Sequence, residues 1–294
     1  MNEAVPYEAM FYHEAENGRV SCFLCPHNCK IPAGSSGLCG VRQNGGGKLA
    51  ATGYGLVSAL ALDPIEKKPL YMFHPGKNVL SIGNFGCNLR CPFCQNCEIS
   101  MEYKERWENT KRVSPEQIDA LAKKYVPDGN IGVAYTYNEP LIGYEFVYDC
   151  AKLIHESRMK NILVTNGYIN REPLEKLAPY IDAMNIDLKG FTEGFYKRLG
   201  GSLEPVKETI KAANQQCHIE ITTLIIPGEN DSEEEIEALA GWIASLNPDI
   251  LLHLSRFFPR YQYEDKVPTS RETIYKLCET AKKHLKHVFA GNIG

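Results

Sequence analysis

Apolar strand-like runs alternate with amphipathic helical patterns along most of the chain, and this alternation limits the fold more than any other feature. The runs are Val79–Phe85, Ile131–Tyr137, Asn161–Thr165, Ala183–Leu188, His218–Ile226 and Ile250–Leu254. Strands that alternate with helices form parallel sheets with the helices outside. Six strands are too few for a closed eight-stranded barrel, and Val288-Phe289 is at most the remnant of another. The pattern therefore predicts an α/β fold, an incomplete parallel (β/α)6 barrel.

Three capping sequences mark the starts of helices between these strands. Ser114-Pro115-Glu116-Gln117 combines a capping box with proline at the first helical position. Ser232 with Glu235, and Thr269 with Glu272, repeat the box. Apolar residues at helical spacing follow each one, so we expect amphipathic helices that pack one face on the sheet.

Composition and charge exclude two classes of partner. Of the 294 residues, 44% are hydrophobic, and the net charge is −4. Nucleic acid and anionic membranes attract basic proteins, so we expect no nucleic-acid partner. No stretch approaches the roughly 20 apolar residues of a membrane span, and Met1–Met10 lacks the pattern of a secretory signal. We therefore expect a cytoplasmic protein that does not associate with membranes.

The chain contains 11 cysteines, which in a long chain without a secretory signal indicate metal binding. Cys87, Cys91 and Cys94 are spaced C-x3-C-x2-C in a loop that leaves the carboxyl end of the first predicted strand. That edge is where α/β folds place their chemistry. Three thiolates can bind three corners of a cubane iron–sulfur cluster and leave one iron open to a small molecule. A zinc knuckle and a redox thiol pair are the alternatives.

A second cysteine group comprises Cys22, Cys25, Cys29 and Cys39, interleaved with proline and glycine turn formers. Four thiols this close together can close a tetrahedral zinc site or hold a second iron–sulfur cluster. Such a metal would brace a segment too short to build its own core. We therefore divide the chain into a cysteine-rich segment, residues 1–76, and a barrel domain, residues 77–294.

Four other cysteines fit the fold without metal chemistry. Cys150 and Cys278 lie on apolar helical stripes, and Cys217 alternates with apolar strand residues. We expect all three to be small buried hydrophobic residues. Cys97 lies close to the cluster loop, and we expect it to be a bystander rather than a spare ligand.

Polar residues follow the predicted strands at their carboxyl ends. They are Asn138 and Glu139, Thr165 and Asn166, Asp187 and Lys189, and His253 and Arg256. The carboxyl ends of parallel strands meet at one edge of a sheet, so we expect these side chains to surround the cysteine loop. Strand periodicity places Asp187 and Lys189 on one face of their strand. Three of these sets also have a structural interpretation: the start of the next helix for Asn138-Glu139-Pro140, a plain ion pair for Asp187 and Lys189, and packing for His253 and Arg256.

The cysteine loop, with Phe93 before its last cysteine, resembles the C-x3-C-x-aromatic-C signature of the radical S-adenosylmethionine (SAM) enzymes. Thr165-Asn166-Gly167 and Asp187-Leu188-Lys189-Gly190 are similar to segments of the pyruvate formate-lyase activator branch. Together with Cys25-Pro26-His27, Cys94-Gln95-Asn96 and Tyr137-Asn138-Glu139-Pro140, they resemble the AmmeMemoRadiSam system radical SAM proteins. Members of that family often carry a further cysteine-rich tail, whereas this sequence stops at Gly294.

This resemblance implies a role for each candidate site residue. Cys87, Cys91 and Cys94 would bind a [4Fe–4S] cluster, and Phe93 fills the aromatic position of its motif. Glu139, beside Asn138, would hold the amino group of SAM, although Tyr137-Asn138 replaces the two glycines usual there. The remaining expected SAM contacts are Asp187 and Lys189, Thr165 and Asn166 at the ribose, the segment Ile225–Gly228 under the adenine, and His253 or Arg256.

The resemblance also implies an activity. A reduced cluster would cleave SAM to a 5′-deoxyadenosyl radical that abstracts hydrogen from a substrate, with flavodoxin or ferredoxin as the reductant. The substrate would be a glycine of a partner protein, as for an activase, or a small molecule. A non-catalytic iron–sulfur protein for electron transfer is the alternative, but it has no use for the polar residues at the strand ends.

Overall fold

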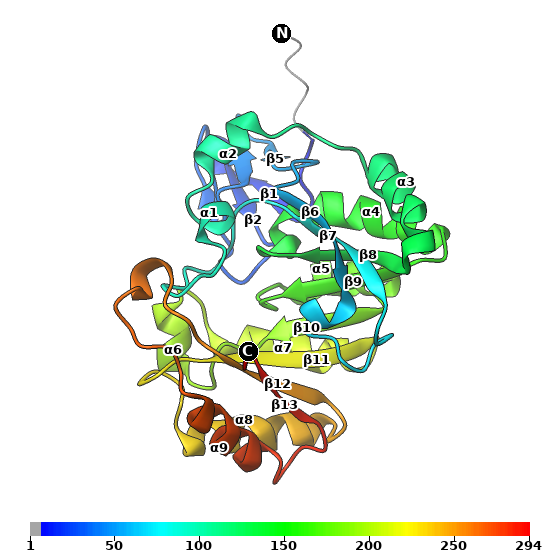
Figure 1. Ribbon diagram of the computed structural model, residues 1–294. Coiled ribbons are helices and arrows are strands. Elements are labelled where there is room, and N and C mark those ends of the chain that lie inside the picture. The colour runs from blue at the N-terminus through cyan, green and yellow to red at the C-terminus, as the bar shows by residue number, and fades with distance from the viewer. Residues whose placement is uncertain (1–6) are drawn as a thin grey trace.

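One curved sheet of eight strands forms the centre of the protein, in a computed structural model that describes residues 7–294 (Figure 1). Its strand order is β13-β12-β11-β10-β9-β8-β7-β6. The bounds are β6 Ala59–Pro64, β7 Asn78–Gly83, β8 Asn130–Thr136, β9 Lys160–Thr165, β10 Ala183–Asp187, β11 His218–Ile225, β12 Leu251–Arg256 and β13 Val288–Gly291. Strands β7 to β13 are parallel, and β6 is antiparallel to β7. Since β6 and β13 stand at opposite edges, the barrel is incomplete, as predicted.

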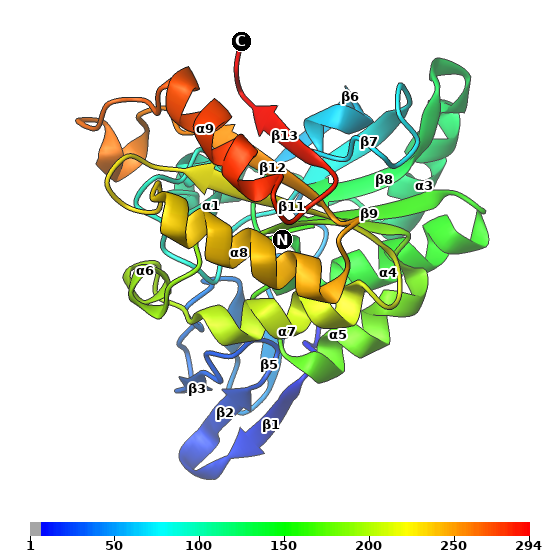
Figure 2. The same cartoon turned by 90° about the horizontal axis from the view of Figure 1, so that it is seen from below.

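Helices cover the outer face of this sheet (Figure 2). They are α3 Pro115–Lys124, α4 Tyr144–Glu156, α5 Arg171–Leu177, α7 Leu203–Ala213, α8 Glu233–Leu246 and α9 Arg271–Ala281. Their apolar residues and those of the strands form one continuous buried core. Three short helices, α1 Cys97–Ser100, α2 Lys104–Asn109 and α6 Glu193–Arg198, lie in connections that follow the carboxyl ends of β7 and β10.

The helix caps agree with the sequence in one case and differ in two. Ser114 and Gln117 form the predicted reciprocal box at α3. Ser232 caps α8 by accepting from the Glu235 backbone N–H, but the Glu235 carboxylate accepts from Phe191 instead of completing the box. The predicted cap at Thr269 is wrong, because the cap of α9 is Ser270. Thr269 is buried, and its hydroxyl donates to the backbone oxygen of Ile225 at 2.5 Å.

All six predicted strands exist, with ends that differ by one or two residues, and β13 extends the suspected remnant at Val288-Phe289. Strand β6 escaped the sequence analysis because it is a partly exposed edge strand whose Leu60 is half exposed. It belongs to the predicted segment 1–76 yet pairs with the barrel strand β7. The boundary between the two predicted domains remains a prediction, and residues 1–6 lie outside the described part of the chain.

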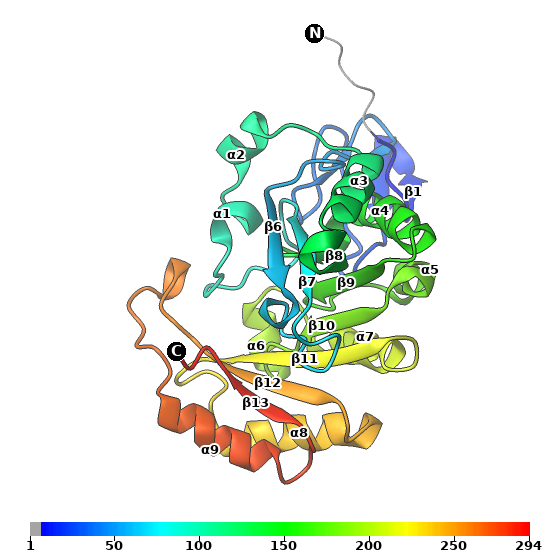
Figure 3. The ribbon, with the colours of Figure 1, turned by 45° about the vertical axis from the view of Figure 1, so that its right-hand side comes forward.

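The amino-terminal segment adds two small sheets beside the barrel, seen at the upper end of Figure 3. One contains β1 Tyr12–Ala15, β2 Arg19–Cys22 and β3 Lys30–Ile31, and the other contains β4 Arg42–Asn44 and β5 Leu49–Ala51. A buried ion pair joins this segment to α4, with 2.9 Å between Arg42 Nη1 and Glu145 Oε1. Within residues 7–294, no helix has the length and apolar character needed to cross a bilayer.

Candidate active site

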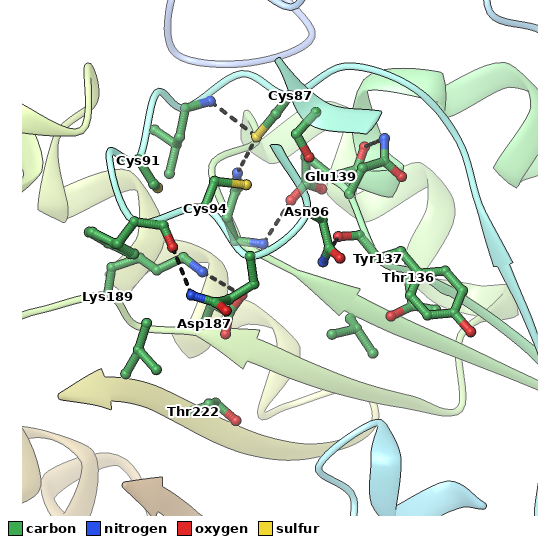
Figure 4. Close-up of a pocket in the computed structure, with 18 of the residues that line it drawn as sticks. Cys87, Cys91, Cys94, Asn96, Thr136, Tyr137, Glu139, Asp187, Lys189 and Thr222 are labelled. Atoms are coloured by element: carbon green, nitrogen blue, oxygen red, sulfur yellow. Dashed lines mark hydrogen bonds and ion pairs between the residues drawn. The ribbon is translucent and has the colours of Figure 1, made fainter. Parts of the chain in front are cut away.

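A pocket of about 360 Å³ opens at the carboxyl ends of the parallel strands. Cys87, Cys91 and Cys94 line it together from the loop that follows β7 (Figure 4). Burial raises the pKa of all three thiols, that of Cys91 to about 12. They are therefore protonated at neutral pH unless a metal displaces the protons.

The cysteine loop is held in shape by its own backbone and by neighbouring aromatic residues. The backbone N–H of Leu89 donates to Cys87 Sγ at 3.4 Å, and Arg90 Nη1 donates to the Cys87 backbone oxygen at 2.7 Å. Phe93 is buried, with its ring centroid 6.1 Å from that of Phe195. The aromatic position of the motif thus fixes one wall of the pocket by packing.

Glu139 is the buried carboxylate of the pocket. Its oxygens accept from Thr165 Oγ1 at 2.8 Å and from the backbone N–H groups of Asn166 and Leu141 at 2.7 and 3.0 Å. Burial raises its pKa to about 7, although these hydrogen bonds act in the opposite direction. Glu139 also caps the short helix Pro140–Gly143, which confirms the structural interpretation, and the same residue lines the pocket. Within residues 7–294, the groups that donate to this carboxylate are all neutral.

Tyr137 shows how this sequence manages without the two glycines. Its φ is 72°, a left-handed conformation that glycine adopts easily and tyrosine rarely. Three contacts hold it there: Tyr137 donates from its hydroxyl to Asp63 Oδ2 at 2.7 Å, Asn96 Nδ2 donates to its backbone oxygen at 2.6 Å, and Lys68 Nζ lies 4.5 Å from its ring centroid. Tertiary contacts thus compensate for the strain that glycine would avoid.

Asn138, Thr165 and Asn166 have different orientations around the pocket. Asn166 lines it and donates from Nδ2 to Asn88 Oδ1 at 2.9 Å and weakly to Cys87 Sγ at 3.8 Å. Asn138 also lines it, and its amide bonds to the backbone on both sides of Phe85. Thr165 does not line the pocket, because its hydroxyl is bonded to Glu139. It can orient that carboxylate but not contact a ribose directly.

Asp187 and Lys189 line the pocket from the end of β10, as their spacing predicted. Their ion pair is short, with 2.6 Å between Lys189 Nζ and Asp187 Oδ2. Burial alone would lower the pKa of Lys189, but Asp187 and the nearby Cys91 hold it above its usual value. The lysine therefore remains a cation that can bind a carboxylate.

His253 and Arg256 do not line the pocket, which corrects the expectation that they contact SAM. His253 Nε2 bonds to Glu220 Oε2 at 2.7 Å in the barrel interior, and Arg256 Nε donates to the Thr269 backbone oxygen at 2.8 Å. The segment Ile225–Gly228 does not line the pocket either; Leu224 does. Strand periodicity explains these positions. Arg256 alternates with Ser255, and Ile225 with Leu224, so each lies on the strand face that turns away from the pocket. His253 shares the face of Ser255 but lies two residues earlier, deeper in the barrel.

Several other polar residues line the pocket that were not among the predicted site residues. They include Lys67, Lys68, Asn96, Thr136, Thr222, Ser255 and Asn292. Thr222 and Leu224 share one face of β11, so strand periodicity points to them once the register is known. Lys68 reaches the pocket from the connection between β6 and β7 and pairs with Asp63 at 2.9 Å, a contact that only the folded chain reveals.

The remaining cysteines differ in exposure. Cys150 and Cys278 are buried as predicted, and Cys97 is buried at the start of α1 without lining the pocket. Cys217 is only half-buried and lies before β11, where its thiol approaches the Ala213 backbone oxygen at 3.7 Å. The prediction that Cys217 is a fully buried hydrophobic residue is therefore wrong.

Neither cysteine group has the geometry of a single-ion site. In the described residues 7–294, no three or more His, Cys, Asp or Glu side chains are arranged to hold one metal ion. Zinc in a cysteine site needs every sulfur about 2.3 Å from one centre. The thiolates of a cubane each bind a different iron, so a cluster does not impose that convergence.

Comparison with known proteins identifies the family to which this chain belongs. The sequence profile of the Radical SAM superfamily matches residues 82–240. An uncharacterized protein of Methanocaldococcus jannaschii is 41% identical over 97% of this chain and 85% of its own length. The pyruvate formate-lyase-activating enzyme of Clostridium pasteurianum is 27% identical over 55% of this chain and 67% of that enzyme.

A solved structure supports the fold. The crystal structure of a radical SAM methyltransferase from Sphaerobacter thermophilus matches with a TM-score of 0.57 at 15% identity, over 74% of this chain and 67% of that one. Fold and pocket together define a partial α/β barrel with a thiol-lined site at the carboxyl ends of its strands. The chain belongs to the radical SAM superfamily and is similar to pyruvate formate-lyase-activating enzymes.

Membership of this superfamily implies a [4Fe–4S] cluster and SAM as cofactors. The donor set of the pocket fits both. Three thiols of one loop suit a cluster with one open iron. Glu139 and Lys189, in the same pocket, offer opposite charges to the amino and carboxylate groups of SAM.

Proposed function

We propose that this radical SAM enzyme cleaves SAM reductively and acts on a glycine of a partner protein, as an activase. The main supporting observation is that one pocket contains the three thiols of the Cys87–Cys94 loop together with Glu139, Asn166, Asp187 and Lys189. An electron-transfer protein would need the thiols but not this polar set.

Each residue has a defined task in the proposal. Cys87, Cys91 and Cys94 hold the cluster, and the ionised Glu139 accepts hydrogen bonds from the amino group of SAM. Lys189 binds the methionine carboxylate, while Asp187 keeps the lysine charged and oriented. Three donors fix the Glu139 carboxylate: the hydroxyl of Thr165 and the backbone N–H groups of Asn166 and Leu141. Preorganised partners of this kind lower the cost of orienting a ligand.

The bound cofactors supply the chemistry: an electron from the reduced cluster splits SAM into methionine and a 5′-deoxyadenosyl radical. The chain itself orients SAM and excludes water. Phe93, Leu89 and Leu224 give the pocket apolar walls, which protect a reactive species from side reactions. A one-electron donor such as flavodoxin or ferredoxin would reduce the cluster.

The choice of a protein glycine as substrate is supported by the relatives. Besides the pyruvate formate-lyase-activating enzyme, an indoleacetate decarboxylase activating enzyme of Tractidigestivibacter scatoligenes is 28% identical over 79% of this chain. A small molecule is the alternative substrate, and the experiments below distinguish the two.

The first experiment tests SAM cleavage. After anaerobic reconstitution and reduction, the protein is incubated with SAM, and 5′-deoxyadenosine and methionine are quantified by mass spectrometry. We expect both products from the wild type and from the matched thiol control Cys217→Ala, and neither from Cys91→Ala. Undiminished cleavage by Cys91→Ala would refute the assignment of the cluster loop.

The second experiment tests the substrate. The reduced enzyme and SAM are mixed with candidate glycyl-radical enzymes, and the partner is examined by electron paramagnetic resonance. A glycyl radical on the partner, formed with one 5′-deoxyadenosine per radical, supports the activase. Transfer of hydrogen from a small molecule to 5′-deoxyadenosine, with no radical on any partner, would refute the protein substrate while leaving SAM cleavage intact.

A further inference from the structure

The four amino-terminal cysteines, hereafter the quartet (Cys22, Cys25, Cys29 and Cys39), lie together outside the pocket described above. All four line a single small cavity, although they come from the end of β2, the turn after it, the residue before β3 and a separate loop. The backbone N–H of Cys22 donates to the Cys29 backbone oxygen at 2.9 Å, which fixes two of them side by side. The chain folds back on itself to bring four thiols to one place.

Arg42 gives a second, independent indication of a ligand at the quartet. It lines the same cavity, is 1% exposed and forms a bidentate ion pair with Glu145, with Nη1 at 2.9 and 3.2 Å. Its Nε is nevertheless buried without a hydrogen-bond partner among the described residues. A buried N–H left unbonded is destabilising, and a sulfur ligand carrying negative charge would accept a hydrogen bond from it.

The quartet segment is interlocked with the cluster loop. His27 Nε2 bonds to the Asn88 backbone oxygen at 2.7 Å, and Arg90 donates to the Leu38 backbone oxygen. The backbone oxygen of Cys39 lies so close to Gly86 that a Cβ there would be 2.5 Å from it. Only glycine permits this approach, because any side chain would clash with that oxygen. Gly86 immediately precedes Cys87, so the contact lies at the start of the cluster loop.

The same segment also touches the loop that follows β9. The Asn170 backbone N–H donates to the Leu24 backbone oxygen at 3.1 Å, and Asn170 Nδ2 donates to that of Phe23 at 2.7 Å. That loop begins with Asn166, which lines the SAM pocket. The quartet segment therefore contacts two of the loops that shape the pocket.

We propose that the quartet binds a four-thiolate metal centre whose function is to brace the cluster loop and the loop after β9. The ligand chemistry is that of a thiophilic centre, and both candidates require all four sulfurs deprotonated. Because the sulfurs in residues 7–294 do not converge on one ion, the geometry favours an iron–sulfur cluster. One zinc ion, for which the four side chains would have to turn towards a common centre, is the alternative that the test separates. The segment is short, and metal binding supplies the free energy that keeps its turns in the conformation that contacts Gly86 and Asn88. This centre is independent of whether the protein cleaves SAM.

The test uses the full chain with Cys87, Cys91 and Cys94 all replaced by alanine, so that bound metal belongs to the quartet. This variant is reconstituted anaerobically with iron and sulfide, or incubated with zinc alone, and metal is quantified per chain. We expect about four irons with four sulfides in the first arm, or about one zinc in the second, and the arms identify the centre. Adding Cys29→Ala should abolish the binding, whereas adding the matched Cys217→Ala should not.

Hydrogen exchange then tests the bracing. Loading the quartet in the same triple variant should slow amide exchange at residues 86–90 and 166–170, as well as 22–40, by about tenfold, equivalent to about 1.4 kcal/mol of local stability. Protection confined to residues 22–40 would overturn the bracing function. A folded triple variant that binds neither iron nor zinc would overturn the metal centre.

A measurement on the wild type covers the case in which the triple variant does not fold. The reconstituted protein is treated with iodoacetamide before and after chelation, and the labelled cysteines are mapped by mass spectrometry. We expect all four quartet thiols to become reactive together after chelation. Labelling of the quartet at the same rate before and after chelation would exclude a bound metal.

Discussion

Two glutamates buried at opposite ends of the barrel strands have opposite electrostatic environments. Glu139, at the carboxyl ends, accepts from a threonine hydroxyl and two backbone N–H groups and from no other group in residues 7–294, and burial raises its pKa to about 7. Glu220, near the amino end of β11, is also buried. There, burial is outweighed by bonds from His218, His253 and two backbone N–H groups, which hold its pKa at about 2.

On the proposed function, the difference in pKa and in hydrogen-bond partners distinguishes Glu139, a ligand-binding carboxylate, from Glu220, a structural one. Glu220 has donors to both oxygens, including two imidazoles, and it fixes the connection between β6 and β7 through Tyr71 and Met72. Glu139 has enough hydrogen bonds to be oriented but not enough to be fully stabilised as an anion. A carboxylate in that state gains most from an added cation, which is what the amino group of SAM would provide.

The largest expected effect follows from removing the negative charge of Glu220, near the amino end of β11. Glu220→Gln should lower the free energy of unfolding by about 3 kcal/mol, because it leaves buried donors without an anionic partner. Anaerobic urea unfolding followed by circular dichroism measures this. The matched control is Glu237→Gln, an exposed glutamate 3.6 Å from His284, which should change stability by less than about 0.5 kcal/mol.

The contrast between a structural Glu220 and a ligand-binding Glu139 can be tested by measuring SAM affinity. SAM affinity of folded Glu220→Gln should equal that of the wild type. A weakened affinity without a stability loss would mean that the amino end of the barrel, rather than the carboxyl end, binds the ligand.

The next largest effect is on SAM affinity and follows from replacing Glu139, at the carboxyl ends of the strands. Glu139→Gln should weaken SAM binding by about 10- to 100-fold, since a charge-assisted hydrogen bond contributes about 1.5–3 kcal/mol. Isothermal titration of the reconstituted protein measures the affinity. Glutamine keeps one accepting oxygen for Thr165 and Leu141, but its NH2 group would face the Asn166 N–H, so we also expect a stability loss of about 1–3 kcal/mol, measured separately by urea unfolding. Unchanged affinity would contradict the role given to Glu139.

The raised pKa of Glu139 predicts a pH dependence with a definite sign. On the proposed function the ionised form binds the ammonium group of SAM, and well below a pKa of about 7 the population of that form falls about tenfold for each pH unit. SAM affinity should therefore rise with pH up to about 7 and then level off. The same titration with Glu139→Gln should be flat over this range, and a parallel slope in both proteins would assign the effect to another group.

The smallest effect tests how the two histidines share Glu220. His253 is buried, whereas the His218 side chain is 32% exposed and bonds to Glu220 Oε1 at 2.9 Å. His218→Gln should cost about 1 kcal/mol of unfolding free energy, and His253→Gln more, because the loss of a bond to a solvent-accessible donor is partly replaced by water. Equal losses in urea unfolding would show that exposure does not distinguish them.

Local sequence patterns were enough to predict much of the fold. The apolar runs predicted the parallel strands, the capping sequences at Ser114 and Ser232 predicted the starts of α3 and α8, and the cysteine spacing predicted the loop that lines the pocket. Asp187 and Lys189 also line the pocket together, as their spacing predicted, although β10 ends at Asp187 and Lys189 lies in the loop that follows. Strand β6 was missed because an exposed edge strand has no clear apolar pattern.

The assignment of His253 shows where such reasoning ends. Its position along β12 was predicted, but its side chain points to Glu220, which approaches from a neighbouring strand. The left-handed Tyr137 depends likewise on Asp63 and Asn96, residues distant in the sequence.

The sequence by itself determined the order of strands and helices, the thiol loop and the residues at the strand ends, because these depend on neighbours along the chain. Only the tertiary structure decided which of those residues face the pocket, that Lys68 joins them, and that the quartet lies against Gly86 and Asn88. Contacts between distant segments are set by packing and register, which no local pattern encodes.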